Sequence, residues 1–472
     1  MNHLNSAGHI HFKSTKEITS SRFGIGLEKL DRNLYDPDPC YDELMALGAK
    51  WVRIQSGWCR TEKEKGNYDF SWLDDIVDNL IKRDMTPWMC LCYGNELYTE
   101  GAVNSAGAVG KPPIKTEEER NAWDNYVTEC VKHFKGRVIW FEIWNEPDGN
   151  WCWRPESNPY EYRDFALRTA KAIKKGNSEA KVISGAFCSN GLAFLFKFLS
   201  PELAKYTDAI TYHSYRTNIE EGTEKHVAEI KAFANSMNDK TEVIQGESGA
   251  QSRYSTRGAL NRMYWTEEKQ AKYILRKLLF DLKTDVKFTS IFTAVDIFEN
   301  IADDYVNINE TDYGFFGVLG ETFKEDGSPL YRYYRKKSFT AMRTLCSLID
   351  DTAKITVLPI RFSAEYFFNI LEEVPNASGN IEYMGFEKEN GAKAFAYWKT
   401  TDSYSTDYAN TISLKVIGIK DDIHLIDTLT GEIYTIPQDQ IVKTDDNEYK
   451  LMHLPIRDYP LFITFGNFAE KE

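Results

Sequence analysis

Short apolar runs alternate with longer stretches of helical periodicity between about residues 22 and 345. The short runs are hydrophobic on both faces, which is typical of strands buried in a parallel sheet. The longer stretches carry helix-start signals, such as the Thr116/Glu119 capping box and Ser71 as an N-cap. Expected strands begin at 22, 50, 86, 138, 181, 209, 242 and 288, and expected helices cover 40–47, 71–83, 116–134, 159–174, 191–198, 222–237, 266–283 and 331–349.

Eight successive strand-then-helix units favour an α/β fold of the (β/α)₈ TIM barrel type over residues 21–350. The competing architecture is an open, doubly wound sheet, which would want a glycine-rich phosphate loop after its first strand. Gly24-x-Gly26 lacks the third glycine and is followed by the acidic Glu28. The barrel is therefore the preferred interpretation.

After residue 351 the pattern changes to alternating apolar and polar positions separated by turn signals such as Thr430-Gly431. Residues 351–472 are therefore predicted to form an all-β sandwich. The first 20 residues contain a strand-like run at 10–18, which we expect to join this sandwich because chain ends often lie close together.

Composition narrows the range of partners. The 71 acidic residues outnumber the 57 basic ones and give a net charge of −14, which argues against nucleic acid and anionic membranes. No apolar run is long enough to span a membrane. The eight cysteines are scattered and read as reduced thiols. The sequence contains no Cys or His motif with the spacing of zinc ligands, and His9-x-His11 alone is weak evidence for a metal site. Neither a cofactor nor a metal is therefore expected.

Chemistry in a barrel is expected where the strands end at their carboxyl side. The fourth strand ends in Trp-Asn145-Glu146-Pro and the seventh in Gly246-Glu247. Two carboxylates should therefore lie close together at the carboxyl-terminal end of the barrel. Glycoside hydrolysis needs such a pair, one to protonate the leaving oxygen and one to attack or to activate water.

With these two motifs, the chain resembles clan A of the glycoside hydrolases, the retaining (β/α)₈ enzymes with catalytic glutamates on strands four and seven. The resemblance covers about residues 20–345, and the appended β-domain makes the chain most similar to glycoside hydrolase family 39. Clan members often carry a Trp at the end of strand eight, where this chain has Phe292 and Phe298.

The resemblance implies roles for individual residues. Glu146 would be the general acid/base, Glu247 the nucleophile, and Asn145 a ligand of the sugar 2-hydroxyl. Tyr215 would hydrogen-bond the nucleophile, and Arg53 would keep it ionised. His213, at the end of strand six, is either a substrate contact or a structural histidine.

Other polar and aromatic residues are also expected near this end of the barrel. Glu142 and Asp148 are expected to be structural, whereas Asp296 and Glu299 could contact sugar hydroxyls. Aromatic rings can stack on the apolar face of a sugar or simply pack the rim. The candidates for stacking are Trp58, Tyr93, Trp151, Trp153 and Phe298.

Long loops at 94–113, 148–160 and 296–330 are expected to enclose a pocket, which suits removal of terminal sugars from oligosaccharides. The leading hypothesis is thus a retaining exo-β-glycosidase of xylosidase, glucosidase or galactosidase type. An endo-β-glycanase with an open cleft and a non-catalytic carbohydrate-binding protein are the alternatives. With no leader visible, a cytoplasmic location is expected, or secretion if a leader preceded Met1. Formation of a homo-oligomer is possible.

Overall fold

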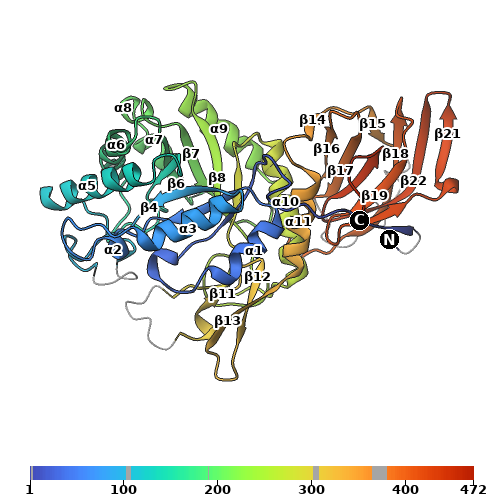
Figure 1. Ribbon diagram of the computed structural model, residues 1–472. Coiled ribbons are helices and arrows are strands. Elements are labelled where there is room, and N and C mark those ends of the chain that lie inside the picture. The colour runs from blue at the N-terminus through green and yellow to red at the C-terminus, as the bar shows by residue number, and fades with distance from the viewer. Residues whose placement is uncertain (2–3, 103–107, 190, 301–307, 364–379) are drawn as a thin grey trace.

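The computed structural model describes residues 1–472 apart from 2–3, 103–107, 190, 301–307 and 364–379. It contains a closed barrel of eight parallel strands beside a domain of two antiparallel sheets (Figure 1). The predicted fold class is confirmed. The barrel strands are β2 (Phe23–Gly26), β3 (Trp51–Gln55), β4 (Thr86–Leu91), β5 (Trp140–Ile143), β6 (Lys181–Phe187), β7 (Ala209–His213), β8 (Glu242–Ser248) and β9 (Thr289–Ile291).

Helices surround the barrel as the sequence periodicity predicts. Thr116 and Glu119 form the expected capping box, whereas Ser71 is the first helical residue and makes no cap hydrogen bond. The main helices are α1 (Asp38–Leu47), α3 (Ser71–Lys82), α5 (Glu117–His133), α6 (Pro159–Gly176), α7 (Ala193–Phe198), α9 (Thr223–Asn235), α10 (Glu267–Lys283) and α11 (Lys337–Leu348), with shorter turns at η1 (Leu30–Arg32), α2 (Trp58–Thr61), α8 (Pro201–Ala204) and η2 (Glu310–Asp312).

The prediction of one helix over 331–349 is wrong in its first part. Residues Pro329–Arg335 form strand β13, which pairs with β12 (Leu319–Phe323) in a hairpin that projects from the barrel (Figure 1). The run Tyr-Arg-Tyr-Tyr-Arg is rich in aromatic residues that favour strands, and helix α11 begins only at Lys337. A second small pair, β10 (Ile297–Phe298) with β11 (Tyr313–Gly314), lies in the same long loop after β9.

Two antiparallel sheets form the C-terminal domain. One has seven strands and the other four, and most of these strands carry buried apolar residues. The larger sheet runs in the order β1 (Asn5–His9), β20 (Glu432–Thr435), β19 (Ile423–Asp427), β23 (Leu461–Phe465), β17 (Lys393–Lys399), β16 (Ile381–Glu387) and β14 (Lys354–Thr356), and the smaller in the order β15 (Ile360–Phe362), β18 (Ala409–Ile417), β22 (Glu448–Arg457) and β21 (Ile441–Asp445), with η4 (Gln438–Gln440) before β21.

The N-terminal strand lies earlier than the sequence indicated. It spans Asn5–His9 and pairs with β20, so both chain ends lie at the sandwich (Figure 1). Residues 11–18 are not a strand. There the side chain of Glu17 accepts hydrogen bonds from the backbone and hydroxyl of Ser14, and such local bonds favour a turn.

Large apolar side chains close the amino-terminal end of the barrel. Trp51, Trp88 and Trp140 gather there around Phe288, and the Trp51 and Phe288 rings stack with centroids 4.2 Å apart. Arg53 lies one layer higher, with its guanidinium carbon 5.5 Å from the Trp88 ring centre. The barrel interior is therefore packed at one end and polar at the other, which leaves the carboxyl ends of the strands for chemistry.

A buried ion pair joins the barrel to the sandwich. Arg276 on α10 donates to both carboxylate oxygens of Glu220, at 2.8 and 2.5 Å, and to the carbonyl oxygen of Thr401. Trp398 on β17 donates to the same carboxylate at 2.8 Å. The two domains thus share one desolvated hydrogen-bond network.

We expect Glu220→Ala to lower the free energy of unfolding by about 3 kcal/mol, because it leaves the Arg276 guanidinium buried without its counter-charge. Urea unfolding followed by tryptophan fluorescence measures this difference. The matched control is Glu221→Ala, whose neighbouring side chain is exposed and should change stability by less than about 0.5 kcal/mol. Equal effects of the two substitutions would contradict the prediction.

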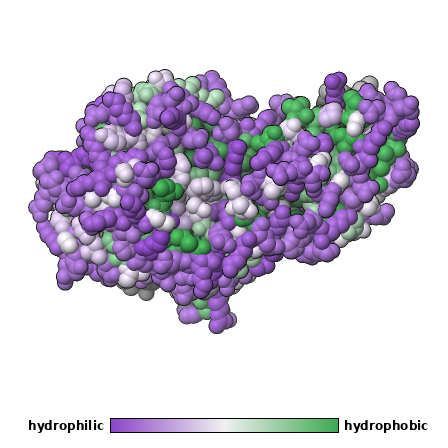
Figure 2. Space-filling view, turned by 45° about the horizontal axis from the view of Figure 1, so that its top comes forward, coloured by the Kyte–Doolittle hydropathy of each residue, from purple (hydrophilic) through white to green (hydrophobic). Residues whose placement is uncertain are grey.

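The surface is mainly hydrophilic over the barrel, with small hydrophobic clusters there and more of them over the sandwich (Figure 2). This agrees with the large number of charged residues. Among the described residues, no helix has both the length and the apolar character needed to cross a membrane.

Candidate active site

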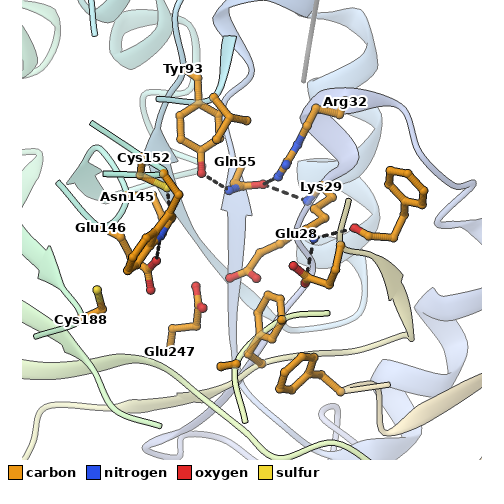
Figure 3. A pocket seen from close by; sticks show the side chains of 18 of the residues that line it. Glu28, Lys29, Arg32, Gln55, Tyr93, Asn145, Glu146, Cys152, Cys188 and Glu247 are labelled. Atoms are coloured by element: carbon orange, nitrogen blue, oxygen red, sulfur yellow. Dashed lines mark hydrogen bonds and ion pairs between the residues drawn. The ribbon is translucent and has the colours of Figure 1, made fainter. Parts of the chain in front are cut away.

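A pocket of about 490 Å³ opens at the carboxyl ends of the barrel strands (Figure 3). Its walls come from all eight strands or from the loops that directly follow them. Trp151 and Cys152 come from the loop after β5, Gly258 and Ala259 from the loop after β8, and Glu299 from the loop after β9. The cavity is therefore enclosed on every side of the barrel axis.

The end of β5 turns sharply and carries Glu146 into this pocket. Glu146 has a φ of 43°, a left-handed conformation that non-glycine residues rarely adopt, and Trp144 has a φ of 64°. The turn is held by a hydrogen bond from the Glu146 amide to the carbonyl of Ala186 on β6, at 3.0 Å. Such backbone strain, fixed by neighbouring strands, is common at functional sites.

Glu247, near the end of β8, faces Glu146 across the pocket (Figure 3). One carboxylate oxygen of each residue, together with a nitrogen of His213, lies within 4.8 Å of the others. Retaining glycosidases hold their two carboxyl groups about 5–5.5 Å apart, whereas inverting enzymes need about 6.5–9.5 Å. The spacing here has the retaining geometry.

Arg53 on β3 organises the carboxyl groups around it. Its Nη1 donates to Glu247 at 2.8 Å, and its Nε and Nη2 donate to Glu142 at 2.9 and 2.6 Å. Nη2 also donates to the side-chain oxygen of Asn145, at 2.8 Å. This last bond turns the Asn145 amide nitrogen away from Arg53. Glu142 is completely buried and has a structural role.

Tyr215 and His213 approach the two glutamates from β7 and the loop after it. The Tyr215 hydroxyl donates to Glu247 at 2.6 Å. His213 Nδ1 lies 3.0 Å from Glu146 Oε1 and 3.8 Å from Glu247 Oε2. The His213 ring is buried and does not line the pocket. Of the two roles considered for it, a structural one that holds the two glutamates therefore fits, and a substrate contact does not.

The electrostatic environment separates the two glutamates. Burial raises the pKa of Glu146, and the nearby charge of Glu247 adds to this effect. Burial would also raise the pKa of Glu247, but the charges of His213 and Arg53 and the hydrogen bond from Tyr215 outweigh it and lower that pKa. The pKa values of the two carboxyls are thus shifted in opposite directions, as the separate roles of acid and nucleophile require.

Only three of the five predicted stacking residues lie at the pocket. Trp151, Tyr93 and Phe298 line it, and Trp151 is 47% exposed with its indole nitrogen donating to Glu146 at 2.5 Å. Trp58 and Trp153 are fully buried. Trp58 packs between the rings of Tyr98 and Tyr126, and Trp153 packs against Trp144, Tyr162 and Phe165, so neither can stack on a sugar.

The two acidic residues that follow the eighth barrel strand, β9, lie in different places. Glu299 lines the pocket and accepts an ion pair from Lys29 at 2.8 Å. Asp296 is buried outside the pocket, where it pairs with Lys336 at 2.6 Å and accepts backbone hydrogen bonds. Asp148 accepts hydrogen bonds from the backbone of Cys188 and Ser189, and so shapes the loop as expected. Phe292 also lines the pocket.

Sequence reasoning missed the wall formed after β2. Glu28, Lys29 and Arg32 line the pocket beside Gln55, whose side-chain oxygen accepts from the Lys29 amide and from Arg32. From the sequence, Glu28 was considered only as an acidic residue that disfavours a phosphate-binding loop. Its position directly after the first strand was the available signal, because the chemistry of such barrels lies at the carboxyl ends of the strands.

Glu146, His213 and Glu247 form a group with metal-ligand spacing in the described part of the chain. Arg53 already places a guanidinium against Glu247, at 2.8 Å, and positive charge at that point disfavours a bound cation. The donor set therefore fits proton transfer better than metal binding.

Comparison with known proteins agrees with this geometry. The family model of "Glycosyl hydrolases family 39" matches residues 47–352. A family 39 glycoside hydrolase from Bacteroides cellulosilyticus is similar in structure, with a TM-score of 0.65 and 18% identity over 95% of this chain and 81% of that one. A family 39 β-xylosidase from Caulobacter crescentus has a TM-score of 0.55 and 16% identity, and the match covers 98% of each chain.

More distant proteins share the fold or a short segment. A family 30 endoxylanase from Clostridium papyrosolvens has a TM-score of 0.56 and 12% identity, covering 98% of this chain and 99% of that one. The β-galactosidase BgaA of Clostridium cellulovorans is 38% identical over 60 residues, which are 12% of this chain and only 9% of that enzyme. The family match, the barrel and the glutamate pair together place the chain in glycosyl hydrolases family 39, as a glycoside hydrolase.

Proposed function

We propose that the protein is a retaining exo-β-glycosidase that removes terminal sugars from oligosaccharides in two displacement steps. The observation that carries the proposal is the close pair Glu146 and Glu247 with pKa values shifted in opposite directions. In the first step, Glu247 attacks the anomeric carbon while Glu146 donates its proton to the leaving oxygen. The glycosidic bond breaks, and a sugar ester of Glu247 forms.

In the second step, Glu146 acts as a base. It takes a proton from a water molecule, whose oxygen attacks the anomeric carbon and releases Glu247 as a carboxylate. Both displacements invert the anomeric carbon, so the product keeps the β configuration. Asn145, with its amide nitrogen directed away from Arg53, is assigned to the sugar 2-hydroxyl.

Exo action is supported by the enclosed pocket. Within the described residues, the pocket is lined from all eight strand ends, which suits a site that receives the end of a sugar chain. Segments 103–107 and 301–307 of the predicted loops lie outside the described residues. The sugar is proposed to be xylose, glucose or galactose, in keeping with the β-xylosidase and β-galactosidase among the similar proteins.

An oligosaccharide series tests this assignment. We expect single sugars or one fixed small unit to be released from one end of xylo-, gluco- and galacto-oligosaccharides, and proton NMR to detect the β anomer first. Products of mixed length from internal cleavage would instead indicate an endo-β-glycanase. A screen of aryl β-glycosides then ranks the sugars.

The opposite pKa shifts predict a bell-shaped pH dependence of kcat/KM. Activity should fall on the acid side as Glu247 becomes protonated and on the basic side as Glu146 loses its proton. Tyr215→Phe removes a hydrogen bond that lowers the pKa of Glu247, so the acid limb should move to higher pH by about one unit.

Trp151→Phe is the matched variant for the other limb. The Trp151 hydrogen bond lowers the pKa of Glu146, so its removal should shift the basic limb to higher pH and leave the acid limb in place. Initial rates on an aryl β-glycoside across the pH range measure both shifts. Movement of the basic limb in Tyr215→Phe, or of the acid limb in Trp151→Phe, would reverse the assignment of acid and nucleophile.

A further inference from the structure

Glu28 is a carboxyl group of the pocket besides Glu146, Glu247 and Glu299, and the two-step mechanism gives it no task. It directly follows β2, and its side chain is only 3% exposed although it lines the cavity. Figure 3 shows the side chains of Glu28 and Glu247 extending towards the centre of the pocket from opposite sides. Its position next to the nucleophile places it within the sugar-binding space.

The two oxygens of the Glu28 carboxyl have different surroundings. Oε1 accepts from Arg53 Nη1 at 2.8 Å, the same nitrogen that binds Glu247 Oε2 at 2.8 Å. Oε2 has no donor among the described residues and is not sealed from solvent, so it faces the pocket. Gly26 leaves room for this arrangement, since a Cβ there would lie 2.9 Å from Oε1. The carboxyl is thus anchored by one oxygen and open at the other.

The charges around Glu28 favour its neutral form. Arg53 faces three carboxyl groups, those of Glu28, Glu142 and Glu247, and one guanidinium can balance only one negative charge. The charges of His213 and Arg53 act on both Glu28 and Glu247, but Tyr215 adds a hydrogen bond to Glu247 alone.

The neighbouring cation is already engaged, because Lys29 forms its ion pair with Glu299. Burial and the charge of Glu247 raise the pKa of Glu28 to about 8, against the opposing effects of Arg53 and His213. This raised pKa favours the protonated carboxyl at neutral pH, in which Oε1 still accepts from Arg53 while the O–H points into the cavity.

We propose that Glu28 is a substrate-binding residue whose neutral carboxyl donates a hydrogen bond from its open oxygen to the C3 or C4 hydroxyl of the sugar being cleaved. The inference rests on the proposed function, since it needs a sugar seated between Glu146 and Glu247. Asn145 is assigned to the 2-hydroxyl, which leaves the hydroxyls further around the ring for the wall that Glu28 forms. Glu28 would then select sugars by the presence of that hydroxyl group.

The test pairs two variants with a set of modified substrates. Wild type, Glu28→Gln and Glu28→Ala are assayed on the best aryl β-glycoside and on its 2-, 3- and 4-monodeoxy analogues. Glutamine keeps a neutral acceptor and donor, so Glu28→Gln should keep kcat/KM within about threefold of wild type. Glu28→Ala should lose about 10- to 100-fold on the parent substrate.

The decisive comparison is between substrates within one variant, because such ratios do not depend on how much of the enzyme is folded. For either the 3-deoxy or the 4-deoxy analogue, the loss seen in wild type should shrink at least about tenfold in Glu28→Ala. Unchanged ratios across the whole deoxy series, or a loss in Glu28→Gln as large as in Glu28→Ala, would overturn the proposal.

Two controls separate this test from failure of the proposed function. Glu321→Gln changes another buried acid, outside the pocket, whose pKa burial raises to about 7, and it should leave the deoxy ratios unchanged. A 2-deoxy-2-fluoro aryl glycoside should label Glu247 covalently in wild type and Glu28→Gln alike. Absence of both turnover and label in wild type would refute the glycosidase assignment itself, whereas normal labelling with unchanged deoxy ratios would refute only the role of Glu28.

Discussion

Glu247→Ala is expected to lower kcat on β-glycosides by about 10⁴-fold or more, because the first displacement loses its nucleophile. Added azide should restore part of the activity, since this small anion fits the space left by the carboxylate and attacks the anomeric carbon directly. A single displacement inverts that carbon, so the product should be the α-glycosyl azide. Product NMR with and without azide measures this outcome.

Glu146→Ala should respond differently, although it also loses most of its activity. Its first step should be slowest on substrates with poor leaving groups, which need the proton that Glu146 supplies. On substrates with good leaving groups, the sugar ester of Glu247 still forms, and azide attacks it without needing a base. Two inversions then give the β-glycosyl azide.

The matched control lies on the same strand. Glu242 begins β8 at the opposite end of the barrel, and among the described residues its side chain pairs with Lys287 at the surface, at 3.5 Å, so Glu242→Ala should keep wild-type rates. Azide products with the same configuration from the variants at Glu146 and Glu247 would contradict the assignment of their roles.

The barrel was predictable because its strands are buried on both faces and its helices carry clear periodicity and caps. Errors arose where local chemistry decides between two structures. The aromatic run of 331–335 forms an edge hairpin instead of extending α11, and the side chain of Glu17 turns the chain where a strand was expected. Neither choice changes the hydrophobic pattern on which the prediction rested.

At the site, residues on the strands themselves were predictable, because a strand end fixes where its side chain points. Glu247 and Arg53 follow this rule, and Glu146 lies in the turn directly after β5. Burial of Trp58 and Trp153 was not predictable, since an aromatic residue in a loop can face either the pocket or the core. Contacts between loops far apart in sequence, such as Lys29 with Glu299, also leave no pattern in a single chain.

Arg53→Met should be the most destabilising single substitution at the site. Arg53 is completely buried and pairs with three carboxyl groups, so a neutral side chain of similar length leaves the charge of the ionised Glu247 uncompensated. We expect the free energy of unfolding at pH 7 to fall by about 5 kcal/mol, the upper end of the range for breaking a buried pair. Urea unfolding measures it, and Arg22→Met, which removes a surface pair with Asp285, should cost less than about 1 kcal/mol.

The pH dependence of this penalty identifies its origin. In wild type, the lowered pKa of Glu247 contributes stability that is present above the ordinary glutamate pKa and is lost as the pH falls through the lowered value. Without Arg53 the pKa of Glu247 should rise, so protonation relieves the uncompensated charge at a higher pH than in wild type. The stability difference between Arg53→Met and wild type should therefore narrow steadily as the pH falls from 7. A difference that stays constant with pH would show that Arg53 acts by packing against Trp88 and not through its charge.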